Sequence, residues 1–396
     1  MYDELNSDTM ETPFIYSTYV TGKNFIGRKV ECNTMGNLLS RQENVVIYAP
    51  PKSGKRSLIQ QTLFNMRLAG GQFIACEVNL FNIRSAETFL TRLGTAVIRS
   101  CYSTPAEYGD VISRMLEGTH FVFDQERFAR YDEVVSLNWE PDANDIDAML
   151  RLPGKIAEER GNRIFIIIEE FQNLMEDGRF ETIFSLLKEV MMQNSGTEDR
   201  KFCFIFSGSK VNAMKYIFED YKYFYRTVEH VPITPVDGRD IVEHVMRGFQ
   251  NSGKVIEQDM IRASCELFRG NLWYINHYMA ICDSMTKGYI NDGILMEALR
   301  MMLSLHEPRF MRMMYSLTVY QINMLKAILD GVVKFSATEV IEKYGFNSSA
   351  NVRRVKDALC KKEIVTFNER DEALVLDPLF EHWLRKYYFE IPELQQ

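Results

Sequence analysis

The chain has 396 residues, which is longer than one ordinary domain and predicts two or three. Hydrophobic residues make up 46% and charged residues 25%, a composition typical of folded globular proteins that excludes a disordered chain. The formal net charge of −8 excludes a uniformly basic surface for nucleic acid, although a local basic face remains compatible with it.

The seven cysteines are scattered, and no two follow the Cys-x-x-Cys spacing. This pattern argues against a disulfide framework and against a zinc site, and it favours a reducing compartment. The acidic residues 1–14 lack the apolar stretch of a secretory signal. No apolar run approaches the roughly 20 residues that span a bilayer. We therefore expect a soluble, cytoplasmic protein without a membrane partner.

Residues 1–43 form a first region, a polar lead-in followed by Phe25-Ile26-Gly27-Arg28 and a helix-like stretch. A second region, residues 44–234, holds short apolar runs that predict buried strands at 44–48, 72–80, 164–168 and 201–206. The last two runs are nearly continuous, as in strands of a parallel sheet covered on both faces. Segments with helical periodicity at 57–68, 86–98 and 180–192 alternate with them, which predicts an α/β sheet with right-handed crossovers. Residues 105–160 are less regular and predict a helical insertion.

The third region, residues 235–310, predicts a small helical bundle. The fourth, residues 311–396, predicts helices at 318–329 and 337–344, a third helix from Ser348 or Ser349 to Lys361, and a hairpin of 364–367 with 373–376. Ser336 is the expected N-cap of the second helix, with Glu339 at the capping-box spacing. This order is a winged helix-turn-helix.

The third helix of that domain offers side chains suited to phosphates and base edges, namely Asn351, Arg353, Arg354 and Lys356. The loop between the two hairpin strands is mostly acidic, however, and the domain balances basic and acidic residues. The sequence therefore leaves two readings open, a DNA-binding module and a protein-interaction module.

The sharpest motif runs from Ala49 to Ser57, Ala-Pro-Pro-Lys-Ser-Gly-Lys-Arg-Ser, between a predicted strand and a predicted helix. It matches the phosphate-loop pattern G-x-x-x-x-G-K-[ST] at the second glycine and the lysine. In such a loop a glycine permits close backbone approach, the helix N-terminus faces anionic oxygens, and the lysine supplies a point charge. The candidate nucleotide-binding residues are Pro51, Lys52, Ser53, Gly54, Lys55, Arg56 and Ser57.

Two departures from the pattern concern the first glycine and the metal ligand. Ala49 replaces that glycine, and Arg56 replaces the Ser or Thr whose hydroxyl ligates Mg²⁺. A guanidinium has no acceptor atom, and Ser57 lies about 100° further around the helix, so it cannot simply take over. ATP or ADP is the expected ligand, and Mg²⁺ binding is in doubt.

The strand at 164–168 ends in Glu169-Glu170, where many P-loop enzymes carry Asp-Glu. The first acid would hold the metal, and Glu170 would polarise the attacking water. Glu169 is one methylene longer than Asp, which disturbs the octahedral geometry of Mg²⁺. Ser209, after the next strand, is a further candidate for contact with phosphate or water.

Taken together, these motifs resemble those of the archaeal-type ATPases, AAA+-like P-loop proteins related to STAND NTPases and origin-recognition initiators. The matching elements also include Gly270-Asn271-Leu272-Trp273-Tyr274 and the C-terminal run from Asp377 to Trp383. The resemblance implies an ATP-binding core, a helical lid over 235–310 and a winged helix. It also implies that Phe25, Gly27 and Arg28 lie near the adenine, that Arg226 is an arginine sensor or finger, and that 270–274 carries the lid's nucleotide contact.

Three functions follow from these patterns. The first is a nucleotide-dependent switch of AAA+ type with weak or lost ATP hydrolysis. The second is a nucleotide-independent or ADP-locked scaffold that binds protein partners through the winged helix, and the third is a DNA-binding regulator in which nucleotide only licenses docking. The sequence leaves open whether the protein forms oligomers.

Overall fold

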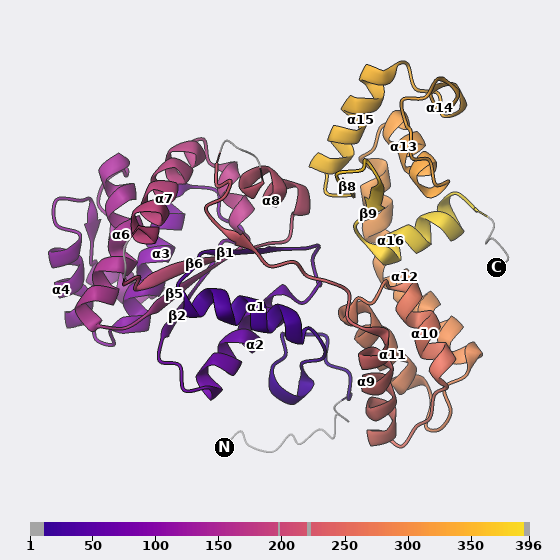
Figure 1. Cartoon of the computed structure of the whole chain (residues 1–396), viewed down its shortest axis with the longest axis horizontal. Helices are drawn as coiled ribbons and strands as arrows, with labels where there is room; N and C mark the ends of the chain where they lie inside the picture. Colours follow the sequence, from indigo (N-terminus) through magenta and orange to yellow (C-terminus); the bar gives the residue numbers. More distant parts are fainter. Residues whose placement is uncertain (1–11, 197–198, 220–222, 392–396) are drawn as a thin grey trace. The chain divides into compact units, whose positions relative to one another are not determined.

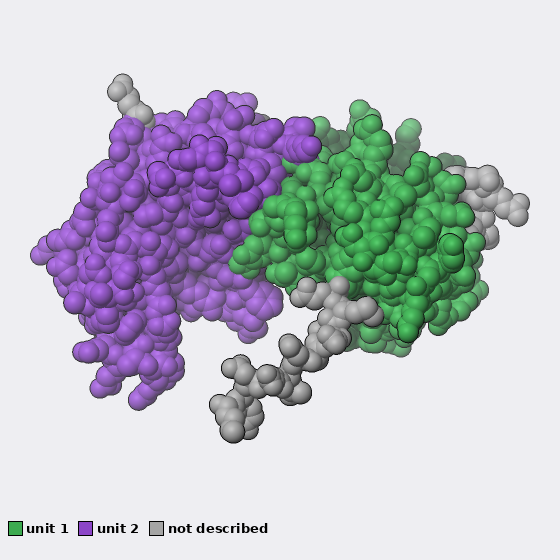
Figure 2. Space-filling view, turned by 90° about the horizontal axis from the view of Figure 1, so that it is seen from below, with its two compact units in different colours: residues 1–28, 52–57, 234–396 green, residues 29–51, 58–233 purple. Residues whose placement is uncertain are grey.

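The computed structural model describes residues 12–196, 199–219 and 223–391, and it divides the chain into two compact units. Unit 1 contains residues 1–28, 52–57 and 234–396, and unit 2 contains residues 29–51 and 58–233 (Figure 2). Most of the acidic start, from which we predicted that there is no secretory signal, lies outside the described residues. In the part of the chain that is described, no helix is long and apolar enough to cross a membrane.

A parallel sheet of five strands in the order β2-β5-β6-β1-β7 forms the centre of unit 2 (Figure 1). Its strands are β1 (Val45–Tyr48), β2 (Ile74–Asn79), β5 (Ile164–Glu169), β6 (Phe202–Gly208) and β7 (Glu229–His230). Each of the four predicted runs coincides with one strand, although β5 and β6 continue past the predicted ends, so the predicted α/β sheet is confirmed. In register, Tyr48 pairs with Gly208 and Glu169 with Ser207, so the carboxyl ends of β1, β5 and β6 reach the same edge.

Helices cover both faces of this sheet, as the continuous apolar runs required. Figure 1 shows α1 (Lys29–Ser40) on one side and α3 (Ala86–Cys101) and α6 (Ala143–Arg160) on the other. The predicted helical insertion contains an unexpected pair of short antiparallel strands, β3 (Phe121–Val122) with β4 (Ser136–Leu137). The remaining elements are α2 (Lys55–Leu68), α4 (Pro105–Met115), α5 (Gln125–Tyr131), the 3-10 helix η2 (Phe171–Glu176), α7 (Phe180–Ser195) and α8 (Val211–Phe218).

The lid segment of unit 1 is helical, as predicted: α9 (Gly238–Asn251), α10 (Gln258–Leu267), α11 (Leu272–Met285) and α12 (Asp292–Tyr315). The N-terminal segment, which includes the 3-10 helix η1 (Gly22–Asn24), is tied to this bundle. Phe14 is fully buried with its ring centroid 4.8 Å from that of Phe249, and Asn276 Nδ2 donates to the carbonyl of Ile15 at 2.9 Å. Because α12 is continuous through residue 310, our boundary between lid and winged helix falls inside one helix.

The winged helix follows with α13 (Val319–Leu329), α14 (Thr338–Lys343), α15 (Ser349–Lys361), β8 (Val365–Phe367), β9 (Ala373–Val375), α16 (Pro378–Trp383) and the π-helical turn η3 (Leu384–Tyr388). Ser348 caps α15 by accepting from the Asn351 amide, as predicted. The prediction for Ser336 is wrong, because Ala337 is the N-cap of α14. The Ala337 amide donates to the carbonyl of Lys334, which places Ser336 inside the preceding turn.

Candidate nucleotide-binding site

The phosphate loop leaves β1 after Tyr48 and ends where α2 begins at Lys55. Lys52 and Gly54 both have positive φ, 66° and 87°. A Cβ on Gly54 would lie 2.9 Å from Arg28 Nη1, and this same nitrogen donates to the carbonyl of Ser53 at 2.8 Å. Position 54 therefore requires glycine for two reasons, the left-handed backbone and the guanidinium packed against it.

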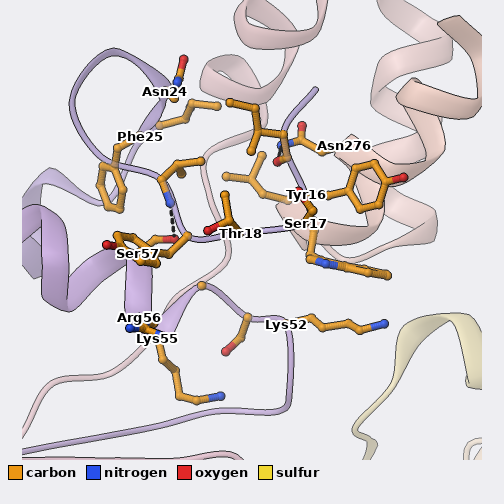
Figure 3. A pocket seen from close by; sticks show the side chains of 18 of the residues that line it. Tyr16, Ser17, Thr18, Asn24, Phe25, Lys52, Lys55, Arg56, Ser57 and Asn276 are labelled. Atoms are coloured by element: carbon orange, nitrogen blue, oxygen red, sulfur yellow. Dashed lines mark hydrogen bonds between the residues drawn. The ribbon is translucent and has the colours of Figure 1, made fainter. Parts of the chain in front are cut away.

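A cavity of about 440 Å³ opens beside this loop, entirely within unit 1. Three segments line it: residues 15–20, 24–26 and 28 of the N-terminal segment, the loop residues 52–57, and the first turns of α11 (Figure 3). Its volume lies within the range of about 300–1,000 Å³ that is usual for small-molecule sites.

Most of the predicted nucleotide-binding residues of unit 1 line this cavity. They are Phe25, Arg28, Lys52, Ser53, Gly54, Lys55, Arg56 and Ser57. Gly27 and Pro51 are not among the lining residues. A Cβ on Gly27, which has φ 64°, would lie 2.8 Å from Val236 Cγ1, so this glycine serves a tight turn.

The cavity fits a phosphate group. The first residues of α2 line the cavity, and helix N-termini attract anions. Ser53 Oγ is buried without a hydrogen-bond partner among the described residues, which leaves one donor for a ligand. Lys55 is buried at the start of the same helix, and burying an ammonium beside a phosphate-sized space is favourable when an anion neutralises it. The residues present therefore fit a nucleotide.

The same loop does not fit Mg²⁺ in the usual way. The exposed guanidinium of Arg56 lies 4.9 Å from the ring centroid of Tyr19. Ser57 Oγ accepts a hydrogen bond from the Val20 amide at 3.1 Å (Figure 3). The hydroxyl next to the missing ligand position is thus engaged by the N-terminal segment.

An acidic cluster occupies the carboxyl edge of the sheet in unit 2. Glu170 has φ 58°, and its Oε2 accepts from Ser209 Oγ at 2.6 Å and from Gln172 Nε2 at 2.7 Å. Glu169 accepts from Asn79 Nδ2 at 3.4 Å. The structure therefore places the predicted base and the predicted polar sensor, Ser209, in direct contact.

Gln172 and Asn79 were missed as site residues in the sequence. Gln172 is 2% exposed and orients Glu170. Gln172 could have been identified from its position two residues after the acidic pair, and Asn79 from its position at the end of a predicted parallel strand.

Arg226 lies near the amino ends of β1 and β7 in the same sheet. It has φ 59° and lines a separate cavity together with Asn44, which precedes β1, and Glu229, the first residue of β7. The phosphate loop starts from the opposite, carboxyl end of β1. Within unit 2, Arg226 and the acidic cluster therefore lie at opposite ends of the sheet strands.

The first turn of α11 joins the lid to the cavity wall. Asn271 caps this helix by accepting from the Trp273 and Tyr274 amides at 3.0 and 3.4 Å. Trp273 and Asn276 both line the cavity. The motif 270–274 therefore does reach the cavity, and Trp273 is the ring that it contributes.

The four DNA-contact candidates of α15 differ in their surroundings. Arg353 and Arg354 are exposed. Asn351 Oδ1 accepts from the Asn347 amide at 3.4 Å. Lys356 forms an ion pair with Asp371 of the wing, and its ammonium lies over the Phe367 ring. Arg353 and Arg354 are thus the exposed basic residues among these four candidates.

Comparison with known proteins identifies the fold. Residues 308–386 match the model of a family described as "Probable winged helix domain". A comparison with the curated proteins finds no match to this chain. Among solved structures, the Walker-type ATPase PABY2304 of Pyrococcus abyssi has a TM-score of 0.65 at 14% identity, over 94% of this chain and 99% of that one.

The ORC2 protein of Aeropyrum pernix is also similar, in its ADPNP–ADP complexes and in its ADP form. Both have a TM-score of 0.54 at 13% identity, and they cover 90% and 93% of this chain and 93% of the other. At such identities the likeness establishes the fold. This chain therefore has the P-loop fold of the archaeal Walker-type ATPase and ORC structures, with a winged helix domain at its C-terminus.

Proposed function

We propose that this protein binds a nucleoside triphosphate or diphosphate in the cavity beside Gly54, and that nucleotide state is transmitted to the lid and the winged helix. The observation that carries the proposal is the composition of unit 1. The phosphate loop, the N-terminal segment, the lid and the winged helix belong to one compact unit, and three of these parts line one cavity. The nucleotides in the related ORC2 structures agree with this ligand class.

We propose further that hydrolysis is weak or lost. Arg56 stands in place of the metal-binding hydroxyl, Ser57 is engaged by Val20, and Glu169 is longer than the usual aspartate. Glu170 remains a sound candidate for the base, because two donors orient its carboxylate. Arg226, at the amino-terminal edge of the sheet, is proposed to act on the site of a neighbouring copy. The seven free cysteines are consistent with a cytoplasmic protein.

Titration with fluorescent ATP, with Mg²⁺ and with EDTA, tests the binding proposal. We expect saturable binding at cellular nucleotide concentrations in both conditions, and a loss of at least tenfold in Lys55→Ala. Lys334→Ala, an exposed lysine of the winged helix, is the matched control and should bind as the parent does. Absence of saturable binding in the parent would overturn the proposal.

Phosphate release in excess Mg²⁺ tests the hydrolysis proposal. The double variant Arg56→Thr with Glu169→Asp should turn over ATP faster than the parent, because it restores a hydroxyl ligand and the shorter acid. A parent that already turns over at about 1 per second or more, within the usual range of enzymes, would contradict a weakened metal site.

A second function, DNA binding through α15, is favoured by the exposure of Arg353 and Arg354 in a matched winged helix domain. Affinity for duplex DNA should fall steeply with salt and should weaken when both arginines are replaced by alanine. Replacing Arg262 and Arg300, exposed arginines of the lid, is the control. Undetectable or salt-insensitive binding would leave protein interaction as the role of this domain.

A further inference from the structure

The side chain of Lys52 lies between the phosphate loop and the lid. Its ammonium is 3.4 Å from the centroid of the Trp273 ring and 5.9 Å from that of Tyr274. Figure 3 shows Lys52 leaving the loop on the side opposite Phe25. The positive φ of Lys52, 66°, aims it there, and a non-glycine residue rarely adopts this backbone without a compensating contact.

The titratable groups around this ammonium are mainly an arginine and two histidines. Burial first, and then the charge of Arg309, lower the pKa of Lys52 to about 8. Burial, together with the charges of Lys52 and Arg309, lowers the pKa of His306 to about 4, and burial and Lys52 lower the pKa of His277. The surroundings of Lys52 therefore destabilise the charged form of its side chain.

The carboxylate that acts on Lys52 is already engaged by other groups. Asp377 raises the pKa of Lys52, but its Oδ2 accepts from Arg309 Nη2 at 2.5 Å and its Oδ1 from the Tyr274 hydroxyl at 2.8 Å. The close partner of the ammonium is therefore the π face of Trp273, which attracts a cation less strongly than an anion does. An anion that reached the loop would be the better partner.

We propose that the Lys52 ammonium leaves the Trp273 ring for the terminal phosphate of a bound nucleoside triphosphate, so that Lys52 and Trp273 set the preference of this site for triphosphate over diphosphate. This inference rests on the proposed nucleotide site and assigns one side chain in it. The helix N-terminus and Lys55 hold the phosphates nearest the loop, and Lys52, on the side away from Phe25, meets the terminal one. A diphosphate leaves the ammonium on the ring.

The same movement links nucleotide state to the winged helix. Tyr274, the neighbour of Trp273, donates to Asp377, which directly precedes α16. Withdrawal of the Lys52 charge reduces repulsion on Arg309, which is paired with that carboxylate. Triphosphate and diphosphate would then differ in the electrostatic field at the start of α16, and this is the differential interaction that a switch requires.

Competition binding of ATP, ADP and AMP to the full chain in EDTA at pH 7.5 tests the proposal. Lys52→Met keeps the length of the side chain and removes its charge. We expect it to weaken ATP about tenfold and ADP by less than threefold. Lys287→Met, at an exposed lysine of the lid, is the control and should change neither. Trp273→Phe keeps an aromatic face and should preserve the ratio, whereas Trp273→Leu should raise the ATP:ADP affinity ratio.

The pH profile supplies a readout that a merely structural lysine would not move. Between pH 7.5 and 9 the phosphates are fully ionised while Lys52 loses its proton, so ATP affinity should fall in the parent and stay flat in Lys52→Met. The other charged or titratable groups near Lys52 are Arg309, His277, His306 and Asp377, and because the pKa values of both histidines are lowered, neither imidazole gains charge in this window.

Two failures are distinguishable. If the parent binds no nucleotide, the proposed function fails and this inference fails with it. If nucleotide binds and depends on Lys55, but Lys52→Met keeps the ATP:ADP ratio within twofold, only the role of Lys52 is overturned.

Discussion

Asp377 is one of the residues through which the lid contacts α16 of the winged helix domain. Its Oδ1 accepts from the amides of Leu379 and Phe380 at 3.0 and 3.2 Å and from the Tyr274 hydroxyl at 2.8 Å. Its Oδ2 accepts from Arg309. Asp377→Ala removes all of these bonds at once, so we expect a large loss of stability in unit 1.

The magnitude follows from two of the losses. Removing a helix N-cap costs about 1 kcal/mol, and a buried phenol left without its acceptor costs about 1–3 kcal/mol. Tyr274 is 3% exposed, so water does not readily replace Asp377. Arg309 is 46% exposed in its side chain and stays hydrated, so its ion pair adds little. We expect Asp377→Ala to lower the free energy of unfolding by about 2–4 kcal/mol, summed from these two terms.

Urea denaturation together with hydrogen exchange over residues 377–383 measures this loss. Asp377→Asn keeps the cap and should cost about half as much. Glu257→Ala is the matched control, because Glu257 is the N-cap residue of α10 and its side chain makes no capping hydrogen bond. If Asp377→Ala unfolds within about 0.5 kcal/mol of the parent, the size of an ordinary surface substitution, our account of this contact is wrong.

Three further changes test other parts of the structure. Gly54→Ala should abolish nucleotide binding and lower the free energy of unfolding by about 1–2 kcal/mol because of its positive φ. Gly70→Ala, at φ 84° with open space around it, should lower the free energy of unfolding through its positive φ alone and should bind nucleotide normally. Gly208→Ala would place a Cβ 2.4 Å from a methionine of α8 and should cost about 1–3 kcal/mol in a thermal melt, against no loss for Gly178→Ala, which has open space. The His120 pKa is raised by its hydrogen bond to a carboxylate of α6, so the stability it contributes is present below about pH 6.5 and is lost as pH rises through the raised value. Urea midpoints at pH 6 and 8 should therefore differ more in the parent than in His120→Gln.

The sheet was predictable because three of its strands, β1, β5 and β6, are buried on both faces. Residues 164–168 and 202–206 are apolar at nearly every position, and a covered parallel strand has no polar face to interrupt the run. The strand β7 escaped prediction for the opposite reason. Glu229 and His230 are polar and exposed at the sheet edge, and only their pairing with β1 makes them a strand. The local amino-acid composition does not predict such a pairing at the sheet edge.

The candidate site also has a part that the sequence predicted and a part that it did not. The phosphate loop was found because close approach of backbone to phosphate imposes a short motif with glycine and lysine. The opposite wall of the cavity, which includes Tyr16, Thr18 and Asn276, has no motif, because many combinations of side chains can line such a wall. Lys356 shows a further limit of sequence reasoning. Its helical position suggested an outward-facing charge, but Asp371 of the wing, 15 residues later, engages it.

One departure in the phosphate loop, Arg56, and the serine that follows it have a structural role. Arg56 lies on the ring of Tyr19, and Ser57 accepts from the amide of Val20, so both residues anchor the cavity wall to the first turn of α2. Replacing the metal-binding hydroxyl by arginine thus exchanges a catalytic ligand for a clamp on the N-terminal segment.

This exchange predicts that Arg56→Thr alone weakens nucleotide binding by about 2–5-fold, the equivalent of about 0.5–1 kcal/mol for an exposed cation–π contact. Tyr19→Leu should cause a similar loss, and the double variant should lose no more than either single one, because both remove the same contact. Tyr19→Phe keeps the ring and should bind as the parent does. Additive losses in the double variant would show that Arg56 and Tyr19 act separately, and the clamp would then have no basis.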